Sequence, residues 1–212
     1  MAIESYSDIV TLMVPEVPGA SPDVLNFHVR DAARRFCEDS ELWLRDATAN
    51  LESGAAEYSL DLGDDARVQR VRRVRFLDPD NDNADDPKAG RVISPACYNV
   101  VTEDDGTSTL QLFGAGIPTD ADDGFTLLVT ASWVPGNVDE DTLPVAFLAR
   151  WADAIRYRAM STMMFFPNRP WHDPQQAVVY VTLYEDMIAR ARGELHREGK
   201  YVNLRMRAPS FT

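Results

Sequence analysis

The sequence contains few of the residues that commonly build reactive sites or covalent frameworks. Its 212 residues include two cysteines, Cys37 and Cys97, and three histidines. Two cysteines exclude a disulfide-rich scaffold, and we expect reduced thiols, as in a protein made in a cytoplasm. No apolar run reaches the roughly 20 residues needed to cross a bilayer. The first residues also lack a basic region followed by an apolar stretch, so we expect neither a secretory signal nor a membrane span.

Basic residues are outnumbered as well. The chain has 21 lysines and arginines against 34 aspartates and glutamates, which gives a formal net charge of −13. Affinity for DNA or for an anionic membrane depends on cationic side chains, so we expect this chain to repel such surfaces rather than bind them. The 45% hydrophobic and 9% aromatic content nevertheless favours a folded protein over a disordered acidic chain.

Two helical blocks flank the middle of the chain. The first begins at Ser21, which precedes a proline as an N-cap residue precedes proline at the first helical position. Apolar residues then recur at helical spacing at Leu25, Val29, Ala32, Phe36 and Trp43. This pattern predicts a single helix from residue 22 to about residue 46.

The second block, residues 143–199, contains two helices. Pro167 and Pro170 must end the first of them, because proline lacks the N–H donor and restricts the residue before it. Asp173 then precedes another proline and has a glutamine three positions later, which is typical of a helix start. The tail, residues 201–212, is basic and has no core pattern, so we expect it to extend away from the body.

Between residues 48 and 138 the apolar period changes to two. The clearest run places four apolar residues on one face of a strand: Leu127, Val129, Ala131 and Trp133. Turn-forming pairs such as Ser53-Gly54 and Asp123-Gly124 separate the runs. Five or six short strands with tight connections indicate an antiparallel sheet or a small sandwich.

The predicted fold class is therefore α+β. Residues 1–47 and 140–200, from both chain ends, are expected to form a three-helix bundle. Residues 48–139 are expected to form an inserted antiparallel β-sheet or sandwich, and residues 201–212 an extended C-terminal tail.

No histidine has the partners that catalysis or metal binding requires. His28 lies among apolar residues on the first helix, and we interpret it as a packed side chain. His172 follows Trp171 at a turn, where stacking or capping is expected, and His196 suits the C-terminal end of the last helix. No serine or cysteine is arranged with a histidine base in a known pattern. We therefore predict no catalytic, cofactor-binding or metal-binding residues and no enzymatic activity.

The acidic run at residues 78–86 partly resembles a calcium-binding loop. Aspartates occupy the first three alternating ligand positions. However, Asn83 replaces the required glycine, and Ala89 stands where the bidentate glutamate belongs. We interpret the run as a solvated loop between strands, and the sequence leaves open whether it binds a cation.

Five arginines lie between residues 67 and 75 and alternate with apolar residues, which predicts a strand with a charged face. In so acidic a chain, the expected partner of this face is a carboxylate surface on a neighbouring subunit or another protein. The candidates for subunit pairing are Arg70, Arg72, Arg73 and Arg75.

Two segments resemble the head-to-tail adaptor (connector) proteins of tailed bacteriophages, including the tail tubular protein A type. Residues 17–46 have Val-Pro-Gly, a helix that starts with proline, then Arg-Asp-Ala-Ala and Phe-Cys-Glu before a tryptophan. Residues 143–192 have Trp-Ala-Asp-Ala-Ile and Pro-Trp-x-Asp-Pro around the turn between two antiparallel helices. The β segment matches in type and position rather than in residues.

The resemblance implies a structural protein of the virion, made in the host cytoplasm and placed at the head–tail junction. Such adaptors form rings, of twelve subunits in this family, between the portal protein and a downstream tail or nozzle protein. Double-stranded DNA passes through the ring without sequence-specific binding. The C-terminal tail then becomes a candidate portal-docking arm, with candidate contacts at Tyr201, Arg205, Arg207 and Phe211.

Two alternatives remain open at this stage. A virion-associated hydrolase of cell-wall or capsule glycan would require two carboxylates about 5 to 9.5 Å apart in a cleft. A ligand-binding β module on a helical base would require exposed aromatic residues on one face. The available aromatic residues are Tyr58, Tyr98, Phe113 and Phe125, each of which is more economically explained as a core residue.

Overall fold

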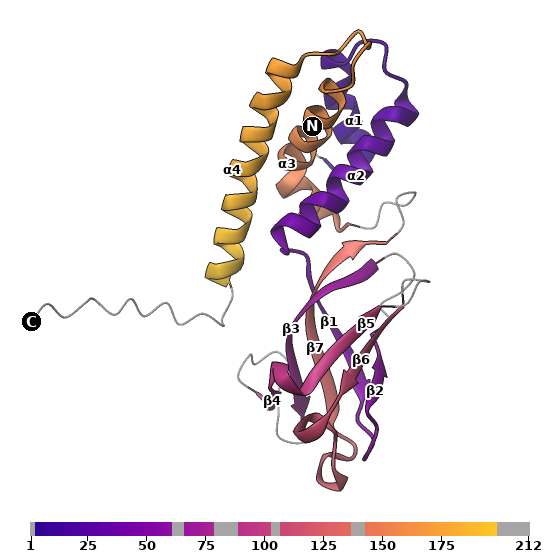
Figure 1. Ribbon diagram of the computed structural model, residues 1–212, viewed down its shortest axis with the longest axis vertical. Coiled ribbons are helices and arrows are strands. Elements are labelled where there is room, and N and C mark those ends of the chain that lie inside the picture. Colours follow the sequence, from indigo (N-terminus) through magenta and orange to yellow (C-terminus); the bar gives the residue numbers. More distant parts are fainter. Residues whose placement is uncertain (1–2, 61–65, 79–88, 103–106, 137–142, 199–212) are drawn as a thin grey trace, which may run out of the picture.

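The structure is a computed structural model that describes residues 3–60, 66–78, 89–102, 107–136 and 143–198 (Figure 1). Helices from both chain ends form a layer at one end of the molecule, and the strands occupy the other end. The helices are α1 (Tyr6–Met13), α2 (Pro22–Ser40), α3 (Val145–Met164) and α4 (Pro174–Glu198). The α+β class and the bundle built from both chain ends are confirmed.

The start of α2 is as predicted, but its end is not. The Ser21 hydroxyl accepts a hydrogen bond from the backbone N–H of Val24, and Pro22 is the first helical residue. The helix stops at Ser40, because Glu41 adopts a left-handed conformation with φ of 52°. The prediction that this helix reaches residue 46, and with it the bundle boundary at residue 47, is wrong.

Trp43 belongs to the connection between α2 and the β segment instead. Its carbonyl accepts a hydrogen bond of 2.9 Å from the backbone N–H of Trp133. The Trp43 side chain is buried at this connection. Its position matched the apolar spacing of the helix, but the residue is apolar because it packs beside the β segment. The strand β1 (Leu44–Asn50) begins at the next residue.

The turn between α3 and α4 is as predicted. α3 ends at Met164, before the two prolines, and the Asp173 carboxylate accepts hydrogen bonds from the backbone N–H groups of Gln175 and Gln176. His172 lies at this turn, and its Nδ1 is 3.1 Å from the carbonyl oxygen of Met164. It therefore caps the end of α3, one of the two roles expected for it.

The helical layer also contains α1, which brings the α-helices among the described residues to four rather than three. Ser5 caps this helix, with Asp8 accepting hydrogen bonds from the backbone N–H groups of Glu4 and Ser5. Ile9 and Met13 are fully buried, so α1 adds to the core of the bundle. None of the described helices combines the length and the apolar character needed to cross a membrane.

Two antiparallel sheets make up the β segment. The first has the strand order β1-β7-β3-β4, and the second has the order β2-β6-β5. The bounds after β1 are β2 (Glu57–Ser59), β3 (Ala66–Leu77), β4 (Arg91–Ile93), β5 (Tyr98–Thr102), β6 (Ser108–Leu112) and β7 (Thr126–Pro135). The four residues predicted to share a buried face of β7, Leu127, Val129, Ala131 and Trp133, are all buried.

β3 is the longest strand, and its register against β7 is interrupted twice. The register shifts between Val68 and Arg70 and again between Val71 and Arg73. These bulges place Val68, Val71 and Val74 opposite Trp133, Ala131 and Val129, so three valines spaced three residues apart share the core face. Arg70, Arg73 and Arg75 consequently occupy the opposite face of the strand.

The buried residues of the helical layer and of the β segment form one continuous hydrophobic cluster. Phe36 of α2 contacts Trp151 of α3, while Trp133 of β7 donates its indole N–H to the carbonyl of Arg45. Cys37 is buried in α2 and Cys97 lies before β5, and both thiols are free. Burial raises the pKa of the Cys37 thiol, which keeps it protonated and unreactive.

Candidate interaction surfaces

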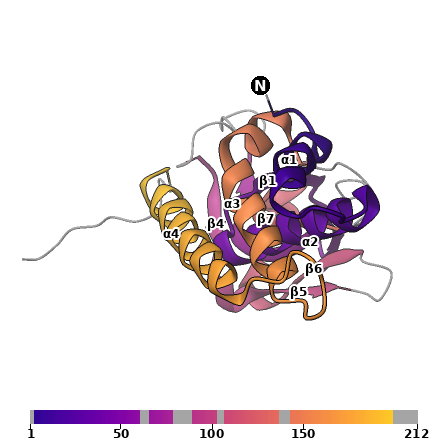
Figure 2. The same ribbon diagram turned by 90° about the horizontal axis from the view of Figure 1, so that it is seen from above.

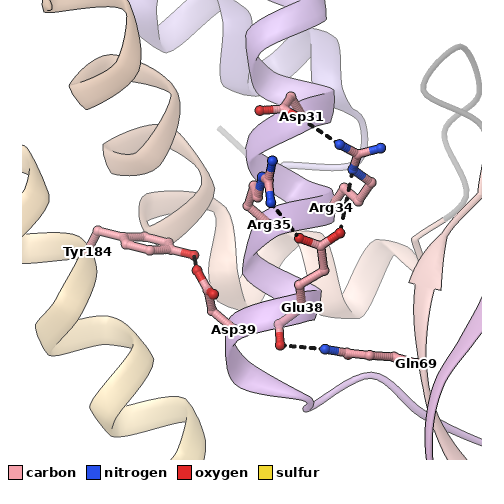
Figure 3. Close-up of polar contacts among 7 residues, drawn as sticks. All are labelled: Asp31, Arg34, Arg35, Glu38, Asp39, Gln69 and Tyr184. Carbon is pink, nitrogen blue, oxygen red and sulfur yellow. Dashed lines mark hydrogen bonds and ion pairs between the residues drawn. The ribbon is translucent and has the colours of Figure 1, made fainter.

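The C-terminal end of α2 is the point where the helical layer meets the β segment (Figure 3). The last carbonyl groups of a helix have no partner within the helix. Here the Glu38 carbonyl accepts a hydrogen bond of 2.7 Å from Gln69 Nε2 of β3. The Asp39 carbonyl accepts one of 2.8 Å from Arg192 Nε of α4. Three elements that are distant in sequence are thereby joined at one helix end.

The Asp39 carboxylate provides a further link from α2 to α4. The Tyr184 hydroxyl donates to Asp39 Oδ2 over 2.7 Å, and the Tyr184 ring is buried (Figure 3). Burial raises the pKa of the Tyr184 hydroxyl, and the neighbouring Asp39 raises it further. The hydroxyl is therefore a stable donor at neutral pH.

Other polar contacts at this end lie along α2 itself. Arg34 pairs with Asp31 over 3.2 Å, and Arg35 pairs with Glu38 over 3.1 Å (Figure 3). Partly exposed pairs of this kind contribute roughly 0.2–1 kcal/mol each. They stabilise α2 itself, whereas Asp39 and Gln69 make the contacts that join α2 to α4 and to β3.

The structure gives the four predicted pairing arginines of β3 different roles. Arg70 and Arg72 both pair with Glu41, so part of their charge is already neutralised within the chain. Arg75 is buried, and its Nη1 donates to the Ala89 carbonyl over 3.1 Å. Arg75 is therefore removed from the candidates for contact with a neighbouring subunit, because its side chain is packed inside the protein.

Arg70 remains the most accessible candidate of this set. Its side chain is 62% exposed, compared with 29% for Arg72. Arg73 lies on the same face as Arg70 and is half-buried. For Arg70, Arg72 and Arg73, pairing with another subunit stays a prediction. The portal-docking candidates Tyr201, Arg205, Arg207 and Phe211 lie outside the described residues.

The side chains of His28 and His172 make packing and capping contacts. The His28 ring contacts the rings of Phe27 and Phe166 at centroid distances of 5.4 and 5.5 Å. Burial lowers the pKa of His28, which favours its neutral form. This agrees with the predicted packed histidine. His172 caps α3 as described above, and the side chain of His196 lies outside the described part of the chain.

No group of three or more histidine, cysteine, aspartate or glutamate side chains is positioned to hold a metal ion among the described residues. The acidic run that partly resembles a calcium loop lies outside the described residues except for Asp78. Of the four aromatic residues considered for a ligand-binding β module, Phe113 is 43% exposed and Tyr58 is buried. Tyr98 and Phe125 are half-buried.

α4 has an apolar outer face near its N-terminal end, which we call the α4 surface. Its residues Val178, Val179 and Leu183 are 56%, 48% and 37% exposed. The opposite face of the helix is buried through Ala177, Tyr180 and Tyr184. Figure 2 shows α4 at one edge of the helical layer, with α3 between it and α1. An apolar face at the edge of a layer is a surface suited to protein–protein contact.

Comparison with known proteins adds no further assignment: no family model matches the sequence, and no curated protein matches it. The resemblance of residues 17–46 and 143–192 to head-to-tail adaptors stays a prediction.

Proposed function

We propose that the protein is a structural head-to-tail adaptor of a tailed bacteriophage virion. Copies of the chain associate through their helical layers into a ring, for which the family resemblance implies twelve subunits. The ring lies between the portal protein and a downstream tail or nozzle protein, and double-stranded DNA passes through it. The protein is made in the host cytoplasm and acts without enzymatic chemistry, cofactor or membrane.

The observation that carries this proposal is the packing of the two resembling segments against each other. α2 lies in the first segment and α3 and α4 in the second, and Asp39–Tyr184 joins them across the layer. This layer then leaves the apolar α4 surface uncovered at its edge. When a patch on one subunit contacts a different patch on the next subunit, the interface is heterologous. Such an interface closes into a ring when the rotation between neighbouring subunits allows it.

The acidic composition is compatible with a conduit for DNA. A surface that neutralised many phosphates would hold the duplex and slow its passage. A ring of subunits that each carry a formal charge of −13 would instead repel the duplex. A ring with a predominantly basic lumen at its narrowest point would contradict this part of the proposal.

The test is ring formation in the presence of the portal protein. The full-length chain is mixed with its portal, and the particles are examined by electron microscopy and mass measurement. We expect a ring of the chain attached to the portal. A chain that stays monomeric with the portal, or that binds it as single copies without forming a ring, would contradict the proposed function.

A matched pair of variants tests the α4 surface separately. Val179→Glu together with Leu183→Glu places two charges on this surface, while Val92→Glu places one charge on an exposed position of β4. We expect the first variant to lose the ring and the second to retain it, with the helical content of both unchanged by circular dichroism. Ring formation by the first variant would remove the α4 surface from the interface without removing the adaptor function.

A further inference from the structure

The helical layer contains a groove that follows α3 and reaches from α4 to the start of α2. Three adjoining hollows of about 390, 350 and 310 Å³ make up this groove. The first two share Arg158 and Val181, and the second and third share Phe166. The contact between Asp39 and Tyr184 joins α2 to α4 and borders the first hollow (Figure 3). We call the second and third hollows together the α2–α4 groove.

Apolar side chains form much of this groove. Phe165 and Phe166 are 47% and 46% exposed, and Val24 is 42% exposed. They lie beside buried Met163 and half-buried Val181. Each hollow has a volume within the range of about 300–1,000 Å³ that is common for binding pockets. A partner that covered these side chains would remove exposed apolar area from water.

Two arginines border the same groove without a carboxylate partner among the described residues. The Arg158 guanidinium lies 5.5 Å from the centre of the Tyr184 ring, and that of Arg169 lies 5.9 Å from the Trp171 ring. Elsewhere on α3 the arginines are paired, Arg150 with a glutamate of α4 and Arg156 with Glu16. No carboxylate is among the residues that line the two hollows. The groove is thus cationic in a chain that is strongly acidic overall.

The hydrogen-bonding groups of the groove also favour a partner that supplies acceptors. The hydroxyl groups of Ser161 and Thr162 already donate to the Arg158 carbonyl, at 2.8 and 3.1 Å. The indole Nε1 of Trp171 is buried and has no acceptor among the described residues. A buried donor of this kind is unfavourable unless an acceptor reaches it. The N–H donors of the groove that a partner can reach are those of half-buried Arg158 and exposed Arg169.

We propose that the α2–α4 groove binds an acidic segment of a partner protein that is anchored by apolar side chains. Carboxylates of the segment accept hydrogen bonds from Arg158 and Arg169, while its apolar side chains cover Phe165 and Phe166. A DNA duplex would supply the negative charge but no apolar anchor. This site is distinct from the α4 surface, and the proposal does not depend on ring formation.

The hollow nearest the β segment is left out of the proposed site because its charges are mixed. Asp39 and Glu185 line it together with Arg192. Asp39 already accepts the Tyr184 hydroxyl, and Arg192 donates to the Asp39 carbonyl. Asp39, Tyr184 and Arg192 therefore bind one another.

The experiment selects ligands from a displayed library of random peptides with the full-length protein as bait. Enriched peptides are labelled and titrated by fluorescence anisotropy against the wild type and against Arg158→Gln combined with Arg169→Gln. Arg190→Gln is the matched control, because Arg190 is an exposed arginine of α4 that pairs with Glu194 and does not line the groove. Thermal unfolding verifies that each variant is folded.

We expect acidic peptides with aromatic or aliphatic anchors to be enriched. The double variant should bind them about tenfold more weakly, because each exposed ion pair contributes a factor of roughly two to five. Phe166→Ser should weaken binding as well, and Arg190→Gln should leave it unchanged.

Five outcomes would overturn the proposal. The first three are a selection that yields no enriched peptide, one that yields peptides without acidic residues, and one that yields peptides that bind the double variant as tightly as the wild type. Displacement of the peptide by a short DNA duplex would assign the groove to nucleic acid. Loss of self-association in the double variant would assign it to a second copy of the chain.

Discussion

The link between α2 and α4 through Asp39 and Tyr184 gives the sharpest prediction about stability. In Tyr184→Phe the ring keeps its packing and its contact with the Arg158 guanidinium, which depends on the ring face rather than on the hydroxyl. The change therefore removes one hydrogen bond and little else. Asp39 is half-buried and loses the donor to its Oδ2.

A hydrogen bond to a charged group contributes about 1.5–3 kcal/mol when no water replaces the lost partner. Water reaches the half-buried Asp39 in part, so we expect a loss of about 1–2 kcal/mol in the free energy of unfolding. Tyr157→Phe is the matched control. Tyr157 stacks on Tyr180, and its hydroxyl has no partner among the described residues, so we expect a change below about 0.5 kcal/mol.

The same contact has a defined dependence on pH. The pKa of Tyr184 is raised in the folded protein above its ordinary value near 10, so its contribution is complete below about pH 10 and is lost as the pH rises further. The wild type should therefore lose more stability between about pH 8 and pH 10.5 than Tyr184→Phe does.

Urea unfolding followed by circular dichroism measures both effects. The midpoint should fall in Tyr184→Phe with an unchanged slope, which shows that the compactness of the two states is unaltered. Equal midpoints for Tyr184→Phe and Tyr157→Phe at neutral pH would refute the reasoning. If the wild type and Tyr184→Phe lose the same amount of stability at alkaline pH, the pH-dependent part of the reasoning is refuted.

Three further predictions concern other parts of the chain. Glu41→Gln removes the charge that faces two arginines of β3, so the urea midpoint should fall by the equivalent of about 0.5–1.5 kcal/mol, and an unchanged midpoint would contradict this role. Gly90→Ala should cost about 2–4 kcal/mol in thermal unfolding, because φ is +79° and the new Cβ would lie 2.5 Å from the Phe76 carbonyl oxygen. Gly54→Ala, with φ of +78° and open space around it, should cost about 1 kcal/mol. Equal losses of stability in Gly90→Ala and Gly54→Ala would contradict the role of the close approach to Phe76. Deletion of residues 201–212 should weaken portal binding in a pull-down assay while the thermal midpoint stays unchanged, and undiminished binding would exclude the tail as the docking arm.

The helix starts were predictable because their signals are local. Ser21 and Asp173 each cap the residues that follow them directly, and a proline fills the first helical position in both cases. The end of α2 has no such signal. A helix often ends with glycine in the left-handed conformation, but here Glu41 takes that conformation. Its carboxylate pairs with Arg70 and Arg72, about thirty residues later in the chain.

The α2–α4 groove was not predictable for a related reason. Val24 belongs to α2, Val181 to α4 and Phe166 to the turn after α3, and all three are apolar. Their exposure depends on how these segments pack against one another, which is a tertiary property. Arg158 and Arg169 have no carboxylate partner among the described residues, and this distinction from the other arginines of the helical layer requires the ion pairs of the folded protein.

β3 shows how the sequence can identify an element correctly and still misplace its side chains. A strand was predicted between residues 67 and 76, and it is present, but strict alternation would put Val68 and Val71 on opposite faces. The two bulges return Val71 to the core face, and they place Arg70, Arg73 and Arg75 together on the other. Arg75 is nevertheless buried at the end of that face, where it donates to Ala89. Since the exposed end of the row is Arg70, a search for subunit contacts on β3 should begin with Arg70→Gln rather than with the whole cluster.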